Sequence, residues 1–304
     1  MGALDGYSVL VTGGGTGIGE ACAAALLADG AAVTICGRTA ATLEEAAGRL
    51  AAGGGSVAWT TADVTAEDDV AAAVAKAVEH GGGRLDGVVG NAGGSRHLGP
   101  IVLADVEAVR ATLDLNIIGA FLTLKHAAPH LADSGRGSYV GISSHAGRDS
   151  FRFMGAYGAG KAGMDHLLRV AADEMGGAGI RVNSVQPGVI ATEIMGAITG
   201  GSPVLDSYLA EIPLKRVGEP EEIGALVRFL IGPESGYITG QAISIDGGQS
   251  LRKGADYGAF AQGAYGALGG LGSSLTNSAW QAQTANTNQR NQIIGAGLGM
   301  LWGR

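Results

Sequence analysis

Hydrophobic residues occur in short runs that alternate with longer alanine-rich stretches through most of the chain. Each short run is typical of a buried strand, and the runs begin near Ser8, Val33, Val57, Gly87, Gly137, Arg181 and Ala242. The stretches between them read as helices, of which the longest cover roughly Leu103–Asp133 and Gly155–Gly177. This alternation predicts an α/β fold, a doubly wound parallel sheet of about seven strands with helices on both faces.

A glycine-rich segment follows the first strand. Tyr7 to Val11 is apolar, Thr12-Gly13-Gly14-Gly15-Thr16-Gly17-Ile18-Gly19 comes next, and Glu20 to Asp29 reads as an alanine-rich helix. Strand, glycine turn and helix form the context of a dinucleotide-binding loop, because the glycines admit a pyrophosphate to the helix N-terminus. The spacing is G-x-x-x-G-x-G, and in a chain with 55 glycines a merely flexible loop is the alternative interpretation.

Tyr157 and Lys161 lie four residues apart in the second long helical stretch. This spacing places both side chains on one face of a helix. An ammonium group beside a phenol favours the phenolate and lowers the pKa of the phenol, which can then exchange a proton with a carbonyl or alcohol oxygen. Taken alone, such a pair is usually an ordinary contact on a helix surface.

Further motifs follow in order, each at the end of a predicted strand or inside a predicted helix. They are Asn91-Ala92-Gly93, Asp114-Leu115-Asn116, Ile142-Ser143-Ser144, Pro187-Gly188-Val189-Ile190-Ala191-Thr192 and Ile245-Asp246-Gly247-Gly248. Together with the glycine loop and the Tyr/Lys pair, they resemble the compact branch of the short-chain dehydrogenase/reductase family. The resemblance runs from about Leu4 to Leu251 and implies a single Rossmann-type domain, with ligands at the carboxyl ends of the strands.

The resemblance implies a catalytic tetrad of Asn116, Ser144, Tyr157 and Lys161. Tyr157 would exchange the proton, Ser144 would hydrogen-bond the substrate oxygen, and Asn116 would hold a water that links Lys161 to solvent. Ser143 is the neighbouring alternative to Ser144, and His145 is interpreted as a loop residue outside the site. The residues implied to contact the dinucleotide are Gly13, Gly15, Thr16, Gly17, Ile18, Asp63, Val64, Asn91, Ala92, Gly93, Tyr157, Lys161, Pro187, Gly188, Ile190 and Thr192.

The end of the second predicted strand bears on which nicotinamide cofactor is used. An acidic residue there would bond the ribose 2′-hydroxyl of NAD(H), but Gly37 occupies the position and Arg38 follows. A guanidinium group matches a phosphate in charge and geometry, which predicts NADP(H) with Arg38 on the 2′-phosphate. Thr16 stands where the family often carries a second basic residue, so NAD(H) remains the alternative.

The substrate is predicted less closely than the chemistry. Ala191 to Leu214 is expected to form a lid, and Phe151, Phe153 and Met154 are candidates for the pocket wall. Apolar residues of this kind suit a hydrophobic or acyl-chain substrate, and a ketone such as a 3-oxoacyl thioester is the expected class. Enoyl-thioester reductase-like activity and a non-catalytic dinucleotide-binding sensor or scaffold are the alternatives.

Composition narrows the partners and the compartment. The formal net charge is −8 and no basic run occurs, which argues against nucleic acid. The N-terminus lacks signal-peptide features, no apolar run reaches transmembrane length, and no cluster has metal-ligand spacing. Cys22 and Cys36 are expected to be reduced core residues of a cytoplasmic protein. By the resemblance, a homo-oligomer, either a dimer or a tetramer, is expected.

The C-terminal segment departs from the rest of the chain. Residues 1–252 form the predicted domain, and residues 253–304 are first rich in Gly and Ala and then rich in Asn and Gln. Low-complexity sequence of this kind buries little core by itself. It is interpreted either as a flexible or fused extension or as a segment packed against a partner, and surface association with a membrane stays open.

Overall fold

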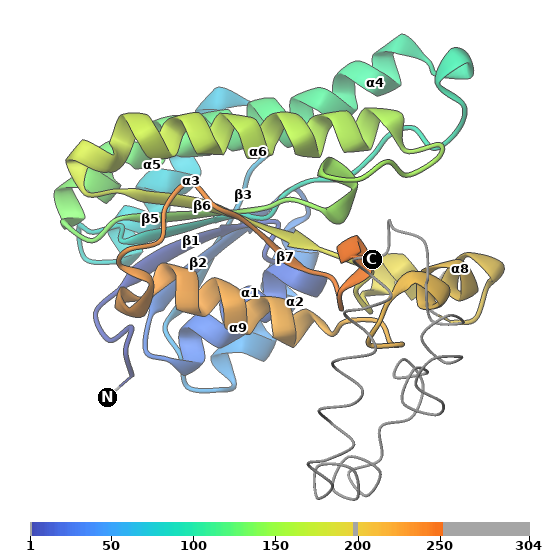
Figure 1. Ribbon diagram of the computed structural model, residues 1–304. Coiled ribbons are helices and arrows are strands. Elements are labelled where there is room, and N and C mark those ends of the chain that lie inside the picture. Colours follow the sequence, from blue (N-terminus) through green and yellow to red (C-terminus); the bar gives the residue numbers. More distant parts are fainter. Residues whose placement is uncertain (1, 197–199, 252–304) are drawn as a thin grey trace, which may run out of the picture. The chain divides into compact units, whose positions relative to one another are not determined.

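A single parallel sheet organises the protein, and its strand order is β3-β2-β1-β4-β5-β6-β7 (Figure 1). The computed structural model describes residues 2–196 and 200–251, so the predicted tail, 253–304, lies outside the described residues. The strands are β1 (Ser8–Thr12), β2 (Ala32–Gly37), β3 (Val57–Thr61), β4 (Gly87–Gly90), β5 (Ser138–Ile142), β6 (Arg181–Pro187) and β7 (Ala242–Ile245). The predicted doubly wound α/β fold is therefore confirmed.

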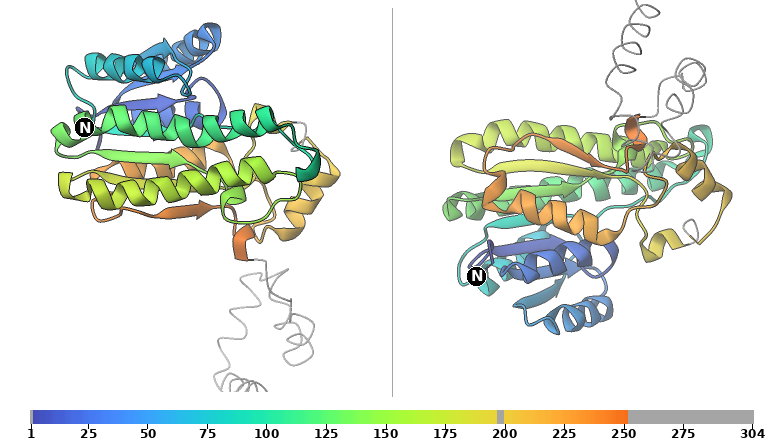
Figure 2. Two further views of the ribbon diagram at one scale, coloured as in Figure 1. Left: turned by 90° about the horizontal axis from the view of Figure 1, so that it is seen from above. Right: turned by 60° about the horizontal axis from the view of Figure 1, so that its bottom comes forward.

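Helices cover both faces of the sheet (Figures 1 and 2). The α-helices are α1 (Gly17–Ala28), α2 (Ala40–Ala51), α3 (Glu67–His80), α4 (Val106–Leu113), α5 (Gly119–Ser134), α6 (Gly155–Met175), α8 (Pro203–Glu211) and α9 (Pro220–Ile231). Short turns of 3-10 helix cover Ile101–Leu103, His145–Gly147 (η3), Gly176–Ala178, Glu193–Met195, Pro233–Ser235 and Gln249–Leu251, and a π-helix (η2) covers Asp114–Ile118.

Alternation along the strands divides the core into two layers. Val9 and Val11 of β1 point to one face, where they pack with α1, α2 and α9. Leu10 between them points to the other face, where it packs with α3, α5 and α6. The strands are therefore apolar on both faces, as a sheet covered by two helical layers requires.

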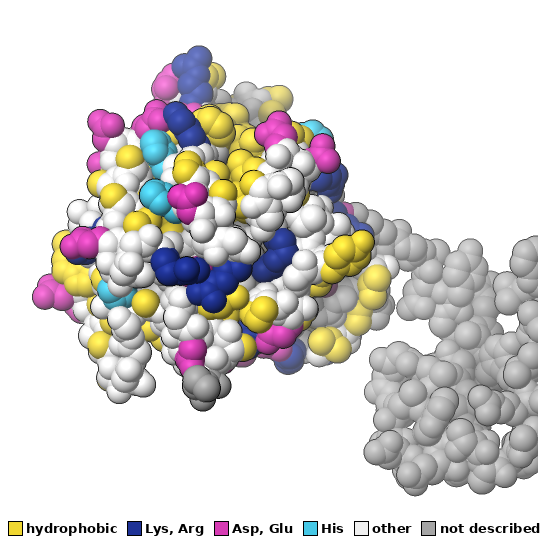
Figure 3. Space-filling model, turned by 90° about the vertical axis from the view of Figure 1, so that its left-hand side faces the viewer, with side chains coloured by type: hydrophobic (Ala, Val, Ile, Leu, Met, Phe, Trp, Pro, Cys, Tyr) yellow, Lys and Arg dark blue, Asp and Glu magenta, His cyan; other side chains and the backbone are white. Residues whose placement is uncertain are grey.

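The strand order reverses at β1, which pairs with β2 on one side and β4 on the other. The chain runs from β1 to β2 and β3 on one side and then crosses to β4 on the other side, so a crevice opens at the carboxyl ends of β1 and β4. In Figure 1 this edge lies to the right, on the side of α8. Figure 3 views the opposite side of the molecule and shows basic side chains gathered across the middle of that face.

The longest predicted helix differs from the observed one at its start and in its middle. Asp105 caps α4, since its side chain accepts a hydrogen bond from the Ala108 N–H at 2.9 Å, and helix therefore begins at Val106 rather than near Leu103. Asp114–Ile118 then forms a π turn between α4 and α5. The periodicity of apolar residues predicts a long helix, but it does not reveal that one turn of that helix contains an extra residue.

Candidate active site

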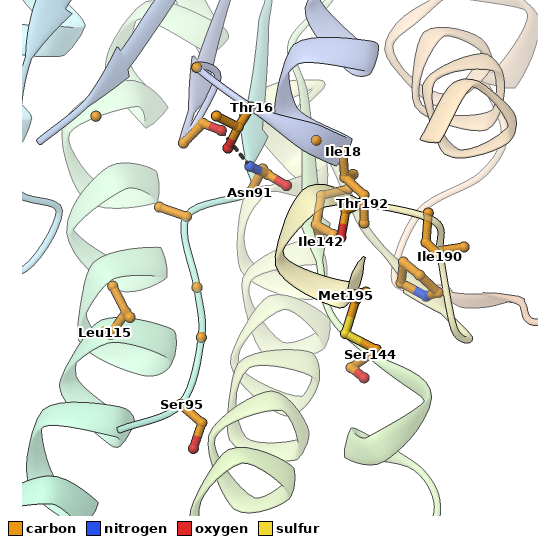
Figure 4. Close-up of a pocket in the computed structure, with 18 of the residues that line it drawn as sticks. Thr16, Ile18, Asn91, Ser95, Leu115, Ile142, Ser144, Ile190, Thr192 and Met195 are labelled. Atoms are coloured by element: carbon orange, nitrogen blue, oxygen red, sulfur yellow. Dashed lines mark hydrogen bonds between the residues drawn. The ribbon is translucent and has the colours of Figure 1, made fainter. Parts of the chain in front are cut away.

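One cavity of about 580 Å³ lies at the carboxyl edge of the sheet. It brings together every residue predicted to contact the dinucleotide, Arg38 included, and Ser144 of the predicted tetrad. Figure 4 shows Thr16 and Ile18 near one wall, Leu115 and Ser95 on another, and Ser144 beside Met195. Asn116 is the predicted residue that does not line this cavity, because it is buried behind it.

The glycine loop forms the floor where β1 passes into α1. Gly13 has φ +63°, and a Cβ on Gly19 would lie 2.1 Å from the Gly13 carbonyl oxygen, so side chains are excluded where the loop meets the helix. Thr16 precedes α1 without a side-chain capping bond within the described residues. Backbone N–H groups at the start of α1 are therefore left for an anion, and the loop fits a dinucleotide pyrophosphate.

A hydrogen-bonded clamp fixes the ends of β1 and β4 against each other. The Asn91 side-chain amide donates to the carbonyl oxygens of Thr12 (3.0 Å) and Gly13 (2.9 Å). In return, the Thr12 hydroxyl accepts from the N–H groups of Asn91 and Ala92, both at 3.0 Å. Thr12 was not among the predicted site residues, although it begins the glycine motif, and its hydroxyl holds the wall that Asn91, Ala92 and Gly93 form.

Tyr157, Ser144 and Lys161 meet at the inner end of the cavity. The Ser144 hydroxyl accepts a hydrogen bond from the Ala146 N–H at 3.1 Å and lies near enough to the Tyr157 phenol to lower its pKa. Lys161 Nζ lies 5.8 Å from the phenol ring centroid. Lys161 Nζ donates to the Ile142 carbonyl oxygen at 2.7 Å. Burial lowers the pKa of Lys161 to about 8, against the opposing effect of Asp165.

The expected lowering of the Tyr157 pKa is not what the structure shows. Burial raises the pKa of Tyr157, and the hydrogen bond with Ser144 offsets only part of that rise. Lys161 Nζ donates its hydrogen bond to the Ile142 carbonyl oxygen and not to the Tyr157 phenol. The spacing of residues along a helix does not reveal a backbone partner on a neighbouring strand. Tyr157 and Lys161 do lie on one face of α6, but Lys161 is not among the groups that change the pKa of Tyr157.

Asn116 occupies the π turn and fixes the loop over Lys161. Its side-chain amide donates to the carbonyl oxygens of Gly94 and Thr112, both at 2.7 Å, and its Oδ1 accepts from the Gly94 N–H at 3.3 Å. A Cβ on Gly93 would lie 2.7 Å from Lys161 Nζ and 2.9 Å from Asn116 Oδ1, so these groups are close neighbours. Such π turns often occur at functional sites.

Arg38 and Asp63 stand at the far end of the cavity. Arg38 follows β2 and is exposed at the cavity rim. The N–H and hydroxyl of Thr65 donate to Asp63 and lower its pKa, and the nearby Arg38 lowers it further. A guanidinium group at an open rim is accessible to a phosphate.

The wall beyond Ser144 is largely apolar, and sequence reasoning found only part of it. Met154 lines the cavity as predicted, and Met195 and Tyr208 come from the predicted lid. Phe151 and Phe153 do not line it. Phe151 packs between His145 and Tyr208, with ring centroids 5.4 and 6.0 Å apart, and Phe153 is half exposed.

Ser95 and Leu115 also line the cavity but are not among the predicted site residues, although Leu115 lies inside the motif Asp114-Leu115-Asn116 and Ser95 follows Asn91-Ala92-Gly93 by two positions. His145 is buried, with 2.5 Å between its Nε2 and Asp149 Oδ2, and it does not line the cavity.

Within residues 2–196 and 200–251, no helix is long and apolar enough to cross a bilayer, and no group of His, Cys, Asp and Glu could hold a metal ion. Cys22 and Cys36 are free and buried, and burial raises the pKa of each thiol to about 12, so neither is a reactive thiolate.

The glycine cradle at the switch point and the Ser144, Tyr157, Lys161 cluster beside it define a nicotinamide dinucleotide-dependent oxidoreductase. A family model described as enoyl-(acyl carrier protein) reductase matches residues 13–250. The chain belongs to the short-chain dehydrogenase/reductase family, and it is an NAD(P)-dependent dehydrogenase acting on CH–OH groups.

Relatives of defined activity match nearly their whole length. The chain is 34% identical over 252 residues to 2,5-dichloro-2,5-cyclohexadiene-1,4-diol dehydrogenase of Sphingobium indicum, covering 82% of this chain and 98% of the relative. It is 35% identical over 239 residues to cis-4-hydroxycyclohexanecarboxylate dehydrogenase of Sinomonas cyclohexanicum, covering 79% and 94%.

Solved structures agree. A short-chain type dehydrogenase/reductase from Mycobacterium ulcerans superposes with a TM-score of 0.80 at 43% identity, covering 89% of this chain and 99% of that one. The 7α-hydroxysteroid dehydrogenase complexed with NADH and 7-oxo glycochenodeoxycholic acid superposes with a TM-score of 0.76 at 29% identity, covering 81% and 94%.

Proposed function

We propose that this protein is an NADP(H)-dependent ketoreductase for a compact hydrophobic ketone, with Tyr157 as the general acid and base. The observation that carries the proposal is that Ser144, Tyr157 and Lys161 share one cavity with the glycine loop at the start of α1. A dinucleotide cradle and a proton-exchanging group in one cavity are what hydride transfer to a carbonyl requires.

Each residue of the tetrad has a role that its position supports. The bound dinucleotide would supply or accept the hydride. Tyr157 donates a proton to the substrate oxygen in reduction and removes it in oxidation. The Ser144 hydroxyl, already in contact with the phenol, donates a hydrogen bond to the charge that develops on that oxygen.

Lys161 supplies positive charge beside the phenol, and Asn116 keeps the Gly93–Gly94 segment seated over Lys161. The predicted Asn116-bound water belongs to this proposal, since it would link Lys161 to solvent. The alternative of a non-catalytic sensor is disfavoured because Ser144, Tyr157 and Lys161 share the lining of one cavity, with Asn116 buried behind it.

The preference for NADP(H) rests on the rim of the cavity. Gly37 stands at the end of β2, where an acidic side chain would favour NAD(H), and Arg38 is exposed beside it. Asp63 is the nearby acid, but its carboxylate already accepts two hydrogen bonds from Thr65. A 2′-phosphate at this rim would therefore meet Arg38 as its main charged partner.

The apolar wall supports a ring-shaped alcohol or ketone as the substrate. Leu115, Met154, Met195 and Tyr208 leave one end of the cavity largely without charged side chains. Relatives matched over nearly their full length are named for cyclohexadienediol and hydroxycyclohexane substrates. A 3-oxoacyl thioester is the second candidate, favoured by the acyl-carrier description of the matching family model, which also keeps an enoyl-thioester substrate in view.

A homo-oligomer is part of the proposal. Ile118 at the end of η2 and Phe121 in α5 are 41% and 43% exposed, and Val170 in α6 is 42% exposed. Large apolar side chains exposed on the two longest helical segments suit packing against a second copy of the same chain. Light scattering of the purified protein should therefore give a mass above that of one chain.

Fluorescence titration with NADPH and NADH tests the cofactor. Arg38→Ala should weaken NADPH binding by about tenfold or more and leave NADH binding within about twofold, because one charge-assisted contact is lost. Arg110→Ala is the matched control, since Arg110 is exposed, pairs with Glu107 and lies outside the cavity lining. Equal losses for both dinucleotides would contradict the role of Arg38.

A substrate panel completes the test. Substituted cyclohexanones, linear ketones, 3-oxoacyl thioesters and enoyl thioesters should be compared by kcat/KM. We expect cyclic ketones to rank first. Turnover confined to thioesters would replace the substrate class, and tight dinucleotide binding without turnover of any compound would favour the sensor.

A further inference from the structure

A second buried charge lies one helical turn beyond Lys161. Asp165 follows Lys161 by four residues in α6, so the two side chains occupy the same face of the helix. That face packs on the sheet, and the side chains of Lys161 and Asp165 are only 2% and 8% exposed. A carboxylate in such a place is costly unless it is hydrogen-bonded and opposed by positive charge.

Strand β6 holds this carboxylate in place. The Ser184 hydroxyl donates to Asp165 Oδ1 and the Gln186 amide donates to Oδ2, both at 2.7 Å. Gln186 is oriented in turn, because its Oε1 accepts from the Ser244 hydroxyl of β7 at 3.3 Å. Both groups that donate to Asp165 are neutral, so they fix the carboxylate without cancelling its negative charge.

The charge of Asp165 acts on Lys161. Burial lowers the pKa of Lys161, and the electrostatic effect of Asp165 opposes that lowering. The other ionisable groups on α6 are Tyr157 and four exposed residues, His166, Arg169, Asp173 and Glu174. Those on the elements around it are Tyr139 of β5, Arg181 of β6, His145 and Asp149 at η3, Asp114 of η2, and Glu107 and Arg110 of α4. Several of these have partners of their own: His145 pairs with Asp149, Glu107 with Arg110, and Arg181 with the Leu230 carbonyl.

We propose that Asp165 is a positioning residue whose buried, hydrogen-bonded carboxylate keeps Lys161 protonated beside the reacting groups. The inference rests on the proposed function, in which Lys161 provides positive charge near Tyr157. A neutral amine at that place would leave the Tyr157 phenolate without its neighbouring cation.

The protonation of Lys161 can be measured directly. The chain has five lysines, Lys76, Lys125, Lys161, Lys215 and Lys253, and biosynthetic incorporation of lysine carrying ¹³C at Cε labels each one without altering its amine. Lys161 is buried and its Nζ is hydrogen-bonded to the Ile142 carbonyl oxygen, so a label built in during synthesis removes the need for a reagent to reach it. The ¹³C signal that disappears in Lys161→Arg identifies Lys161, and its chemical shift is then followed against pH in the full chain.

Asp165→Asn should move the titration midpoint of Lys161 down by about one pH unit or more, because a nearby buried charge is removed. Ser184→Ala is the matched control. It deletes one hydrogen bond to the same carboxylate but keeps the charge, so the midpoint should stay within about 0.3 unit of wild type. An unchanged midpoint in folded Asp165→Asn, or an equal shift in both variants, would overturn the proposal.

A second variant covers a folding failure of Asp165→Asn, whose new amide would face the Gln186 amide. Asp165→Asn combined with Gln186→Glu restores a donor opposite an acceptor and moves the negative charge onto β6. It should give a Lys161 midpoint below that of the wild type, and a midpoint equal to that of the wild type would contradict the role of position 165.

Turnover is measured on the same samples with the ketone panel. A shifted Lys161 midpoint in a protein whose wild type reduces no ketone would uphold the electrostatic role of Asp165 and reject the proposed function. Normal wild-type turnover of a ketone, with a Lys161 midpoint that is unshifted in Asp165→Asn, would uphold the proposed function and reject the electrostatic role of Asp165.

Discussion

Polar side chains are buried at both edges of the sheet, the edge formed by the amino ends of the strands and the edge formed by their carboxyl ends. At the amino edge they are fully hydrogen-bonded, whereas at the carboxyl edge they face an open cavity. At the amino edge, the carboxylate of Asp86 is fully buried and accepts from the Ser8 N–H (2.9 Å), Arg84 (2.7 Å) and Arg136 (2.7 Å). At the carboxyl edge, Tyr157 and Ser144 are enclosed as well, yet their hydroxyls border a cavity of about 580 Å³.

The difference shows in the pKa values of the buried groups. Burial alone would raise the pKa of Asp86, but the two guanidinium groups and the Ser8 N–H outweigh it, so the pKa is lowered. No such compensation surrounds Tyr157, whose pKa burial raises despite the Ser144 bond. Burial therefore marks a functional group only where its partners are incomplete and a ligand can reach it.

The largest expected effect comes from removing the hydroxyl of Tyr157. Tyr157→Phe keeps the ring but deletes the proton that catalysis exchanges, so we expect kcat to fall by about 10³-fold or more while dinucleotide binding stays within about twofold. Steady-state kinetics and the fluorescence titration check both parts.

Tyr139→Phe is the control for this variant. Tyr139 is a fully buried tyrosine of β5 whose hydroxyl makes one long bond, 3.4 Å, to the Ala120 carbonyl oxygen. Its loss should leave kcat within about twofold. Equal turnover in the two variants would show that Tyr157 is not the general acid and base. It would also show that a tyrosine lining the cavity matters no more for catalysis than one buried in the core.

A smaller effect, on stability rather than turnover, is expected at the amino edge. Asp86→Asn leaves two half-exposed guanidinium groups without their carboxylate, so the free energy of unfolding should fall by about 2–3 kcal/mol. Denaturant unfolding measures this loss, and kcat of the protein that remains folded should not change.

Glu107→Gln provides a matched control, since Glu107 pairs with Arg110 on the exposed surface of α4. Its effect on unfolding should stay within about 0.5 kcal/mol. A drop in kcat for Asp86→Asn without loss of stability would show that the amino edge takes part in the reaction.

Sequence reasoning reached the carboxyl edge far better than the amino edge. The glycine loop, Asn91 and Ser144 each follow a strand whose apolar run is visible in the sequence, and the Tyr/Lys pair is a local motif of a long helix. The Asp86 cluster joins Ser8, Arg84 and Arg136, which are brought together only by strand pairing. The spacing of these residues along the chain does not predict that they meet.

The same limit applies inside the site. Thr12 of β1 bonds Asn91 after β4, and Asp165 of α6 bonds Ser184 of β6. Tyr208 reaches the cavity from α8. The contacts of all three residues therefore depend on tertiary packing. The π turn at Asn116 was hidden as well, because one extra residue hardly disturbs a helical pattern.

The smallest effect concerns His80, at the C-terminal end of α3. Its ring nitrogens hydrogen-bond the hydroxyls of Thr34 (3.0 Å) and Ser56 (2.9 Å). Burial, and then Lys76, lower its pKa below the ordinary value of 6.5. The folded protein therefore binds the proton less readily than the unfolded chain, so this contribution to stability is complete above pH 6.5 and is lost as pH falls below it.

His80→Gln keeps hydrogen-bonding groups and removes the titration. Between pH 7.5 and about 5.5, the wild type should lose more unfolding free energy than His80→Gln, because carboxylates such as Asp86 contribute equally to both proteins in that range. Urea unfolding at several pH values measures the difference, and parallel curves would show that His80 is neutral to folding. The turnover of both proteins should follow one pH profile, since His80 belongs to the amino edge, where polar groups stabilise the fold and take no part in the reaction.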